Sequence, residues 1–284
     1  MKRFFVFLLL CCLFLPCLGC AAAPAPAEIV ATTLPVYEFT SRLCRDTGLS
    51  VTRLITENVS CLHDYSLSVR QAKTIQGAQV VVLSGGGLED FMADALSGCD
   101  RIIDSSHSIS LSDHHEHAHG EDPHIWLSPA NAKAMAESIC SGLTEIYPQH
   151  SALFAENLKA LSAELDALEA YGAQQLSELS CRQMITFHDG FHYLAEAFDL
   201  EILKAVEEES GSEASAMELK ELTYLIEENR LPAIFTERSG SVSAAGILAA
   251  ETGVQVYSLD MAMTGNSYFE AMYHNIDTLK EALG

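Results

Sequence analysis

The sequence predicts an α/β protein of two doubly wound lobes, each with a parallel sheet, joined by a long rigid backbone helix. Three observations support this prediction. Short apolar runs alternate with helical patterns between residues 28 and 146, a long Ala-, Leu- and Glu-rich run follows at 151–179, and the alternation restarts at 184. Strands that alternate with helices are typical of parallel sheets, and one long helix between two such series indicates two lobes.

In the first series, four short apolar runs are predicted strands: 28–33, 51–55, 80–84 and 101–106. The segments between and after them have helical spacing and helix-ending residues, and we expect helices at 34–47, 69–76 and 129–146. The helix over 151–179 carries Leu153, Leu158, Leu161, Leu165 and Leu168 at helical intervals.

In the second series, we expect strands at 184–187, 233–237 and 254–260, and helices at 190–198, 217–229, 242–252 and 268–283. The expected organisation is therefore a signal peptide over 1–19, a tether over 20–28, an N-terminal lobe over 29–147 with a His-rich loop at 113–124, a linking helix over 148–179, and a C-terminal lobe over 180–284.

The N-terminus has the features of a secretory signal. Lys2 and Arg3 precede an apolar run over 4–18, which is short for a membrane-spanning helix. Cys20 resembles the lipidated residue of a lipoprotein, although Cys17 stands where that motif usually has an aliphatic residue. A plain signal peptide cut among the next alanines is the alternative. We expect an extracytoplasmic protein held on the cell membrane by a lipid at Cys20, on the cell-surface or periplasmic side.

The charge balance excludes one class of partner. The chain has 39 acidic and 16 basic residues, a formal net charge of −23. Such a surface repels nucleic acid and attracts cations, so we expect no nucleic-acid partner. Five cysteines follow Cys20 without CxxC spacing, and the sequence supports no pairing among them. They are Cys44, Cys61, Cys99, Cys140 and Cys181.

Histidines are concentrated in one polar loop. Of the chain's 11 histidines, His114, His115, His117, His119 and His124 stand within 113–126, among acidic residues. Imidazole is the commonest metal ligand in proteins. The first four could equally form a solvated tract that binds nothing, whereas His124 lies where the loop returns to apolar residues.

Four candidate metal ligands follow predicted strands, where binding sites form in open α/β sheets. His63 and His124 lie in loops after strands of the first lobe. His188 lies at the tip of a strand of the second lobe, and Asp260 ends its last strand. Three imidazoles and a carboxylate suit tetrahedral Zn²⁺. His192 is a rival partner for His188, and Asp260 could instead cap the next segment.

Several motifs give the chain a family resemblance over nearly its whole mature length. They are HDYSLS, GLEDF (Gly87–Phe91), DPHIWLSP (Asp122–Pro129), FHDGFHYLAEAFDLE, IFTE, ETGV and LD…GNSYFEAMYHN. With these motifs the chain resembles the ZnuA-like solute-binding proteins of ABC-type zinc importers, which are related to manganese-binding lipoproteins. The resemblance implies a monomeric protein that captures metal between its lobes and delivers it to an ABC permease and its ATPase.

The resemblance also implies roles for individual residues. Carried onto matching positions, the ligands are His63, His124 and His188, with Asp260 as a possible fourth. His192 stands where the family usually has a small residue, so we do not expect it to be a primary ligand. Manganese-binding relatives place a carboxylate where His188 stands, so we predict zinc, with manganese as the alternative. We interpret the four remaining loop histidines as an accessory tract that collects zinc.

Cys61, two residues before His63, is a departure from the family pattern, and its thiolate is an alternative contributor to the site. A zinc hydrolase is a rival interpretation, but Glu237 and Asp189 are the only nearby candidates for its general base, and no nucleophile motif is present. Gly85, Gly86 and Gly87 lack the Lys and Ser/Thr of a phosphate loop, so we expect a tight turn. A metal-dependent adhesin or a zinc buffer is a further alternative, and we expect no enzyme activity.

Overall fold

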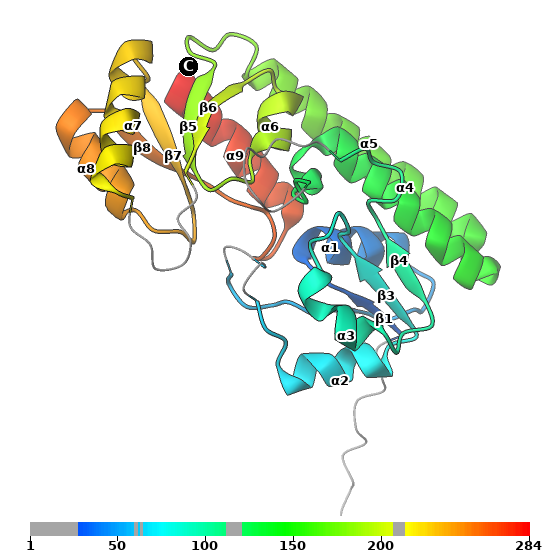
Figure 1. The fold of residues 1–284 in the computed structure, drawn as a ribbon. Helices are drawn as coiled ribbons and strands as arrows, with labels where there is room; N and C mark the ends of the chain where they lie inside the picture. The colour runs from blue at the N-terminus through cyan, green and yellow to red at the C-terminus, as the bar shows by residue number, and fades with distance from the viewer. Residues whose placement is uncertain (1–27, 60–61, 63–64, 112–120, 207–213) are drawn as a thin grey trace, which may run out of the picture.

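The computed structural model describes residues 28–59, 62, 65–111, 121–206 and 214–284. Within them the chain forms two α/β lobes that lie against a shared pair of long helices (Figure 1). Each lobe has a four-stranded sheet in which every neighbouring pair of strands is parallel. The predicted fold class is confirmed.

The N-terminal sheet has the strand order β2-β1-β3-β4. Its strands are β1 (Ile29–Ala31), β2 (Val51–Arg53), β3 (Val80–Leu83) and β4 (Ile102–Asp104). The central strands β1 and β3 are almost entirely buried, as expected for a parallel sheet covered on both faces. The helices of this half are α1 (Leu34–Leu43), α2 (Val69–Gly77), α3 (Ala93–Leu96) and α4 (Pro129–Ile146), with short 3₁₀ turns at η1 (Asp90–Met92) and η2 (Ile125–Leu127).

The C-terminal sheet repeats this arrangement with the order β6-β5-β7-β8. Its strands are β5 (Gln183–Phe187), β6 (Glu201–Ala205), β7 (Ala233–Glu237) and β8 (Gln255–Leu259). Its helices are α6 (His192–Ala197), α7 (Ala216–Asn229), α8 (Ser243–Thr252) and α9 (Tyr268–Leu283). In both sheets the second strand in sequence lies at an edge, so the two lobes share one strand topology.

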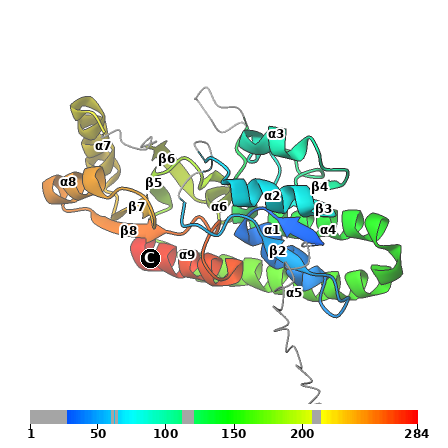
Figure 2. The same cartoon turned by 90° about the horizontal axis from the view of Figure 1, so that it is seen from below.

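The connection between the lobes is α5 (Ser151–Gln175), which follows the 3₁₀ turn η3 (Pro148–His150). Its 25 residues span about 37 Å at 1.5 Å per residue. This helix packs along α4, contacts α1 of the first lobe, and contacts α9 of the second (Figures 1 and 2). Among the described residues, no helix is long and apolar enough to cross a membrane.

Some element ends differ from the prediction. The first helix ends at Leu43 rather than at residue 47, because Asp46 and Gly48 have positive φ angles and turn the chain. The long helix ends at Gln175, where Arg182 donates hydrogen bonds to the terminal carbonyls of Leu176 and Ser177. The short α3 was not predicted.

The lobes share one hydrophobic core. A single cluster of buried residues runs from β1 and α1 through α4 and α5 to α9. A second, smaller cluster fills the space between the C-terminal sheet and helices α7 and α8, and includes Ile185, Leu222 and Leu248. The two lobes are therefore joined by a continuous apolar core.

Candidate metal centre

His188 lies directly after β5, as its position in the sequence predicts. The turn that follows brings Gly190 so close to the imidazole that a Cβ atom there would lie 2.8 Å from His188 Cδ2 and 2.7 Å from Met261 Cε. His188 Nδ1 lies 3.8 Å from the Glu237 Oε2 atom, at the end of the neighbouring strand β7. The ring therefore lies against the Gly190 backbone, with a buried carboxyl group near its Nδ1 atom.

His124 lies at the start of η2, just before α4. Its side chain is 5% exposed, and its ring Nδ1 lies 2.8 Å from Asp122 Oδ1, a hydrogen-bonding distance. The same oxygen accepts the backbone N–H of His124 at 2.9 Å. Asp122 is itself fully buried, and its carbonyl oxygen accepts a hydrogen bond from the Tyr193 hydroxyl of α6.

The segment that carries His124 is fixed to the C-terminal half of the chain. Trp126 donates its indole N–H to the Met261 carbonyl at 2.7 Å, and the Trp126 carbonyl accepts the Tyr268 hydroxyl at 2.8 Å. Trp126 and Tyr268 are fully buried. His124 is thus anchored on both sides of the boundary between the lobes.

The structure brings His124 and His188 together from different lobes. Their ring centroids are 5.4 Å apart and their planes are at 84°. Each imidazole has a carboxyl group on its Nδ1 side, Asp122 for His124 and Glu237 for His188. For His124, a carboxylate that accepts the Nδ1 proton leaves the lone pair of Nε2 for a metal and orients the ring, whereas Glu237 lies beyond hydrogen-bonding distance of the His188 ring. Chemically, the pair can act as two Nε2 ligands.

Glu237 belongs to a group of charges around this pair. Burial, and then the nearby charge of Asp260, raise the pKa of Glu237 from 4.5 to about 8. The Asp260 side chain follows β8 and remains 18% exposed. Its Oδ1 accepts the Ala262 N–H at 2.8 Å, and its Oδ2 lies 3.1 Å from Arg238 Nη1. Asp260 is thus at the expected strand end, with both carboxylate oxygens engaged.

His192, the rival ligand, has a different partner. Its Nε2 lies 2.7 Å from Asp189 Oδ1. Burial opposes the charged imidazolium, but the hydrogen bond to Asp189 and the charges of Asp189, Asp122 and Glu196 outweigh burial and raise the pKa of His192. Asp189, a candidate general base in the hydrolase interpretation, is therefore engaged by His192.

The remaining predicted site residues lie outside the residues that the structure describes. These are His63, Cys61, Cys20 and the accessory histidines His114, His115, His117 and His119. In the described part of the chain, no three His, Cys, Asp or Glu side chains form a group that could hold a metal ion. The four cysteines in that part, Cys44, Cys99, Cys140 and Cys181, are free thiols.

Sequence reasoning missed the partners of the two histidines. Asp122 belongs to the DPHIWLSP motif, and its spacing of two residues from His124 allows a local side-chain contact, which could have indicated the pair. Glu237 was considered only as a general base. It follows an apolar strand, as His188 does, and this shared position could have indicated that the two side chains meet. No sequence signal indicated Arg238.

Two parallel-sheet lobes on a helical backbone, with an imidazole from each lobe meeting between them, define a two-lobed solute-binding protein. Residues 29–282 match the family model ZnuA, described as zinc-uptake complex component A, periplasmic. The chain belongs to this family, which consists of solute-binding proteins rather than enzymes.

Individual relatives agree with this assignment. The zinc-binding lipoprotein AdcA of Streptococcus pneumoniae is 30% identical over 297 residues, which cover 96% of this chain and 59% of AdcA. The chain therefore spans about three fifths of that relative. The Zn(II)-bound ZnuA-like domain of pneumococcal AdcA has a TM-score of 0.78 at 29% identity, covering 90% of this chain and 98% of the domain.

Two further solved structures have the same fold but are described by another bound metal or another role. FpvC of Pseudomonas aeruginosa, in complex with Mn²⁺, has a TM-score of 0.78 at 26% identity, covering 90% of this chain and 97% of that one. The laminin-binding adhesin Lmb of Streptococcus agalactiae has a TM-score of 0.81 at 24% identity, covering 91% of this chain and 100% of that one. At that identity, Lmb shows a shared fold alone.

Proposed function

We propose that this protein captures Zn²⁺ outside the cytoplasm and delivers it to an ABC permease and its ATPase for import. The proposed ligands are His63, His124 and His188, with Asp260 as a fourth. The observation that carries the proposal is the meeting of His124 and His188, each with a carboxyl group behind Nδ1. Membership of the ZnuA family supports it independently.

The chemistry of the donors favours zinc over manganese. Imidazole ligands suit Zn²⁺ and other metals high in the Irving–Williams order, whereas manganese prefers carboxylate and other hard oxygen ligands. His188 supplies an imidazole, and the carboxyl groups of Asp122 and Glu237 lie on the Nδ1 sides of the rings. Manganese remains the alternative cargo, because FpvC binds Mn²⁺ on the same fold.

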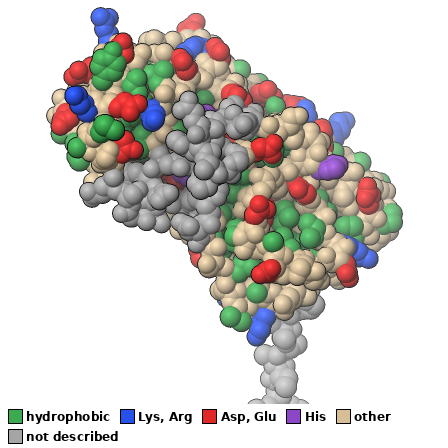
Figure 3. Space-filling model, in the orientation of Figure 1, with side chains coloured by type: hydrophobic (Ala, Val, Ile, Leu, Met, Phe, Trp, Pro, Cys, Tyr) green, Lys and Arg blue, Asp and Glu red, His purple; other side chains and the backbone are tan. Residues whose placement is uncertain are grey.

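The proposed surroundings of the site also suit a cation. Acidic side chains lie on both lobes on the face that Figure 3 shows, in keeping with the net charge of −23.

We propose that His114, His115, His117 and His119 collect zinc at lower affinity. Deletion of residues 114–120 is expected to lower zinc stoichiometry, and uptake at scarce zinc, without abolishing the tight site.

We also propose that a lipid on Cys20 anchors a monomeric protein to the outer side of the cell membrane. AdcA is named a lipoprotein, and Cys20 has the expected position after an apolar run. A Cys20→Ala variant is expected to leave the membrane fraction. Retention of that variant in the membrane would contradict a lipid anchor.

The ligand set is tested by zinc titration against a chelator. His124→Ala and His188→Ala are each expected to weaken zinc binding. The loss should exceed the roughly 10- to 100-fold that is typical when a hydrogen-bond partner of a metal ligand is removed. His274→Ala, an exposed histidine on α9, is the matched control and is expected to bind zinc as the wild type does. Unchanged affinity in His188→Ala, or a wild-type preference for Mn²⁺ at equal free metal, would overturn the assignment.

A further inference from the structure

Arg238 places a fixed positive charge on the proposed carboxylate ligand. It follows Glu237, the last residue of β7, and its backbone N–H continues the sheet by donating to the Leu259 carbonyl at 2.8 Å. This pairing sets Arg238 beside Asp260 at the carboxyl ends of two neighbouring strands. Arg238 Nη1 lies 3.1 Å from Asp260 Oδ2.

Asp260 does not need Arg238 to hold its position. The buried side chain of Asn275, on α9, accepts the Asp260 backbone N–H at 2.7 Å and donates to its carbonyl at 2.7 Å. The Ala262 N–H fixes the other carboxylate oxygen. The arginine therefore contributes its charge to an aspartate that is already oriented.

A guanidinium that is paired with a ligand carboxylate weakens metal binding in two ways. It repels a divalent cation, and it occupies an oxygen that the cation would use. We infer that Arg238 is a specificity-determining residue, which weakens the carboxylate of Asp260 as a metal ligand and so favours metals that bind mainly through imidazole. This inference rests on the proposed function. It assigns part of the selectivity for zinc over manganese to Arg238.

The size of the effect follows from exposure. The Arg238 side chain is 65% exposed and that of Asp260 18%, so water screens the pair. Ion pairs of this kind contribute little, and removing the guanidinium should tighten Mn²⁺ binding by about two- to fivefold. The gain for Zn²⁺ should be smaller, because three imidazoles already satisfy most of its preference.

The experiment measures Zn²⁺ and Mn²⁺ affinities of the mature protein by chelator competition. Arg238→Gln is expected to tighten Mn²⁺ more than Zn²⁺, and this gain should vanish in an Asp260→Asn background. Arg238→Lys keeps a cation and should retain most of the wild-type selectivity. Arg70→Gln, which removes an exposed charge on α2, is the matched control and should change neither affinity.

Two results would overturn the inference. One is unchanged or weaker Mn²⁺ binding in an Arg238→Gln variant whose circular dichroism and thermal midpoint show a folded protein. The other is an equal gain with and without Asp260. The His188→Ala variant separates this failure from that of the proposed function. If zinc binding depends on His188 while Arg238→Gln is silent, only the role of Arg238 fails. If zinc binding is independent of His188, the proposed site itself fails.

Discussion

At the scale of single residues, the site depends on how the two imidazoles are held. Asp122 is fully buried and uses one oxygen for both the ring and the backbone of His124. Glu237 is nearly as buried but lies 3.8 Å from the His188 ring, beyond hydrogen-bonding distance. The orientation of His124 therefore depends on a direct hydrogen bond to Asp122, whereas Glu237 makes no such bond to His188.

Asp122→Asn is expected to weaken zinc binding by about 10-fold, because the neutral amide is a poorer acceptor for the His124 ring proton. The measurement is chelator competition at neutral pH. Asp199→Asn changes a carboxylate that is 95% exposed and serves as the control. Equal zinc affinity in the two variants would show that Asp122 does not position the ligand.

Gly190→Ala is expected to weaken zinc binding and lower the thermal midpoint, because the new methyl group would lie 2.8 Å from His188 Cδ2 and 3.0 Å from its Nε2. Gly246→Ala is the matched control, since a Cβ there meets nothing within 4 Å. That helical site should gain up to about 1 kcal/mol of stability. If Gly190→Ala binds zinc as tightly as the wild type, the His188 ring does not lie against Gly190 in the zinc-bound protein.

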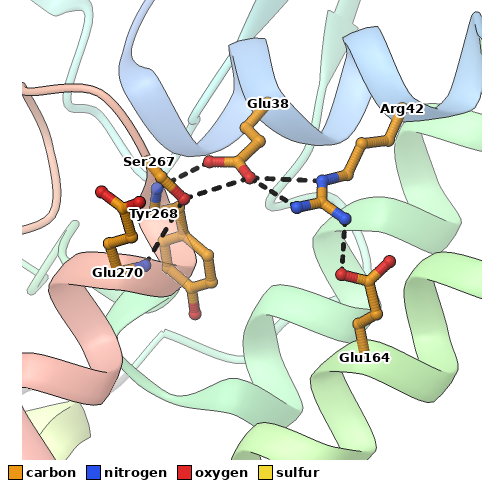
Figure 4. Close-up of polar contacts among 6 residues, drawn as sticks. All are labelled: Glu38, Arg42, Glu164, Ser267, Tyr268 and Glu270. Atoms are coloured by element: carbon orange, nitrogen blue, oxygen red, sulfur yellow. Dashed lines mark hydrogen bonds and ion pairs between the residues drawn. The ribbon is translucent and has the colours of Figure 1, made fainter.

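At the scale of elements, one glutamate of α1 joins three helices (Figure 4). Glu38 accepts the Tyr268 N–H at the start of α9 at 2.6 Å, and its other oxygen lies 2.8 Å from Arg42 Nη2. Arg42 in turn lies 2.6 Å from Glu164 of α5 and 4.5 Å from the Phe269 ring centroid. A carboxylate at a helix N-terminus is favourable both as an acceptor and as a negative charge.

Glu38→Ala is expected to lower the free energy of unfolding by about 2 kcal/mol, because it removes charged hydrogen bonds from a partly buried helix end. Chemical denaturation gives the measurement. Lys133→Ala breaks the exposed ion pair with Asp166 and should leave the stability nearly unchanged, because water screens the two charges. A similar loss in both variants would contradict a special role for Glu38.

The turn after β3 is organised by a buried carboxyl group. Glu89 accepts the backbone N–H groups of Ser84 and Gly85 and the hydroxyl of Thr32. Gly85 has a φ of +83°, and a Cβ there would lie 1.9 Å from Asp104 Oδ1. The glycine run is therefore a tight turn, as predicted, and Glu89 uses the N–H groups of Ser84 and Gly85.

Stability is expected to depend on pH through Glu89. Burial, and to a smaller extent the charge of Asp104, raise its pKa from 4.5 to about 7 against the effect of its hydrogen bonds. Between these values the folded protein keeps a proton that the unfolded chain has lost, so this contribution to stability falls as pH rises, by at most about 1.4 kcal/mol per pH unit. Glu89→Gln cannot titrate. The stability of wild type minus that of the variant should therefore decrease from pH 4.5 to 7, measured by denaturation, and a constant difference would contradict the raised pKa.

At the scale of the whole molecule, the lobes are parts of one packed body. The main core cluster crosses the boundary between them. The segment after Asp260 is also bonded to the first lobe, because Leu34 donates its backbone N–H to the Met263 carbonyl and Asn58 accepts the hydroxyl of Thr264. Asn58 also accepts the hydroxyl of Ser239, which follows β7. Such a body is expected to unfold as a unit.

Thermal unfolding should therefore show one cooperative transition. Trp126 is the chain's single tryptophan, fully buried and bonded to Met261 between the lobes, so its fluorescence reports on this boundary. The fluorescence transition should coincide with that of far-ultraviolet circular dichroism, and the calorimetric and van't Hoff enthalpies should agree. Loss of the Trp126 signal at a lower temperature would show that the lobes separate before they unfold.

Much of this architecture could be predicted because it is encoded locally. The strand Ala233–Glu237 and the helix Tyr268–Leu283 were predicted with the bounds that they have, since an apolar run of strand length and an amphipathic run behind a Ser cap are properties of neighbouring residues. His124, His188 and Asp260 were predicted as candidate ligands because parallel strands place their following residues at one edge of a sheet. The ends of the first helix and of the long helix were less accurate, because the turn through Asp46 and Gly48 and the hydrogen bonds of Arg182 to the Leu176 and Ser177 carbonyls follow them.

The sequence by itself determined the two-lobed fold, the strand ends that carry the candidate ligands, and the family, because these depend on local periodicity and on motifs. Only the tertiary structure decided which distant side chains face one another. The contacts of Glu237 with His188 and of Arg238 with Asp260 depend on which strands are neighbours in the C-terminal sheet, and the contact of Glu38 with Tyr268 depends on how the lobes pack. Which charged side chains surround the two imidazoles therefore depends on burial and on the packing of strands and helices, and no local sequence pattern specifies either.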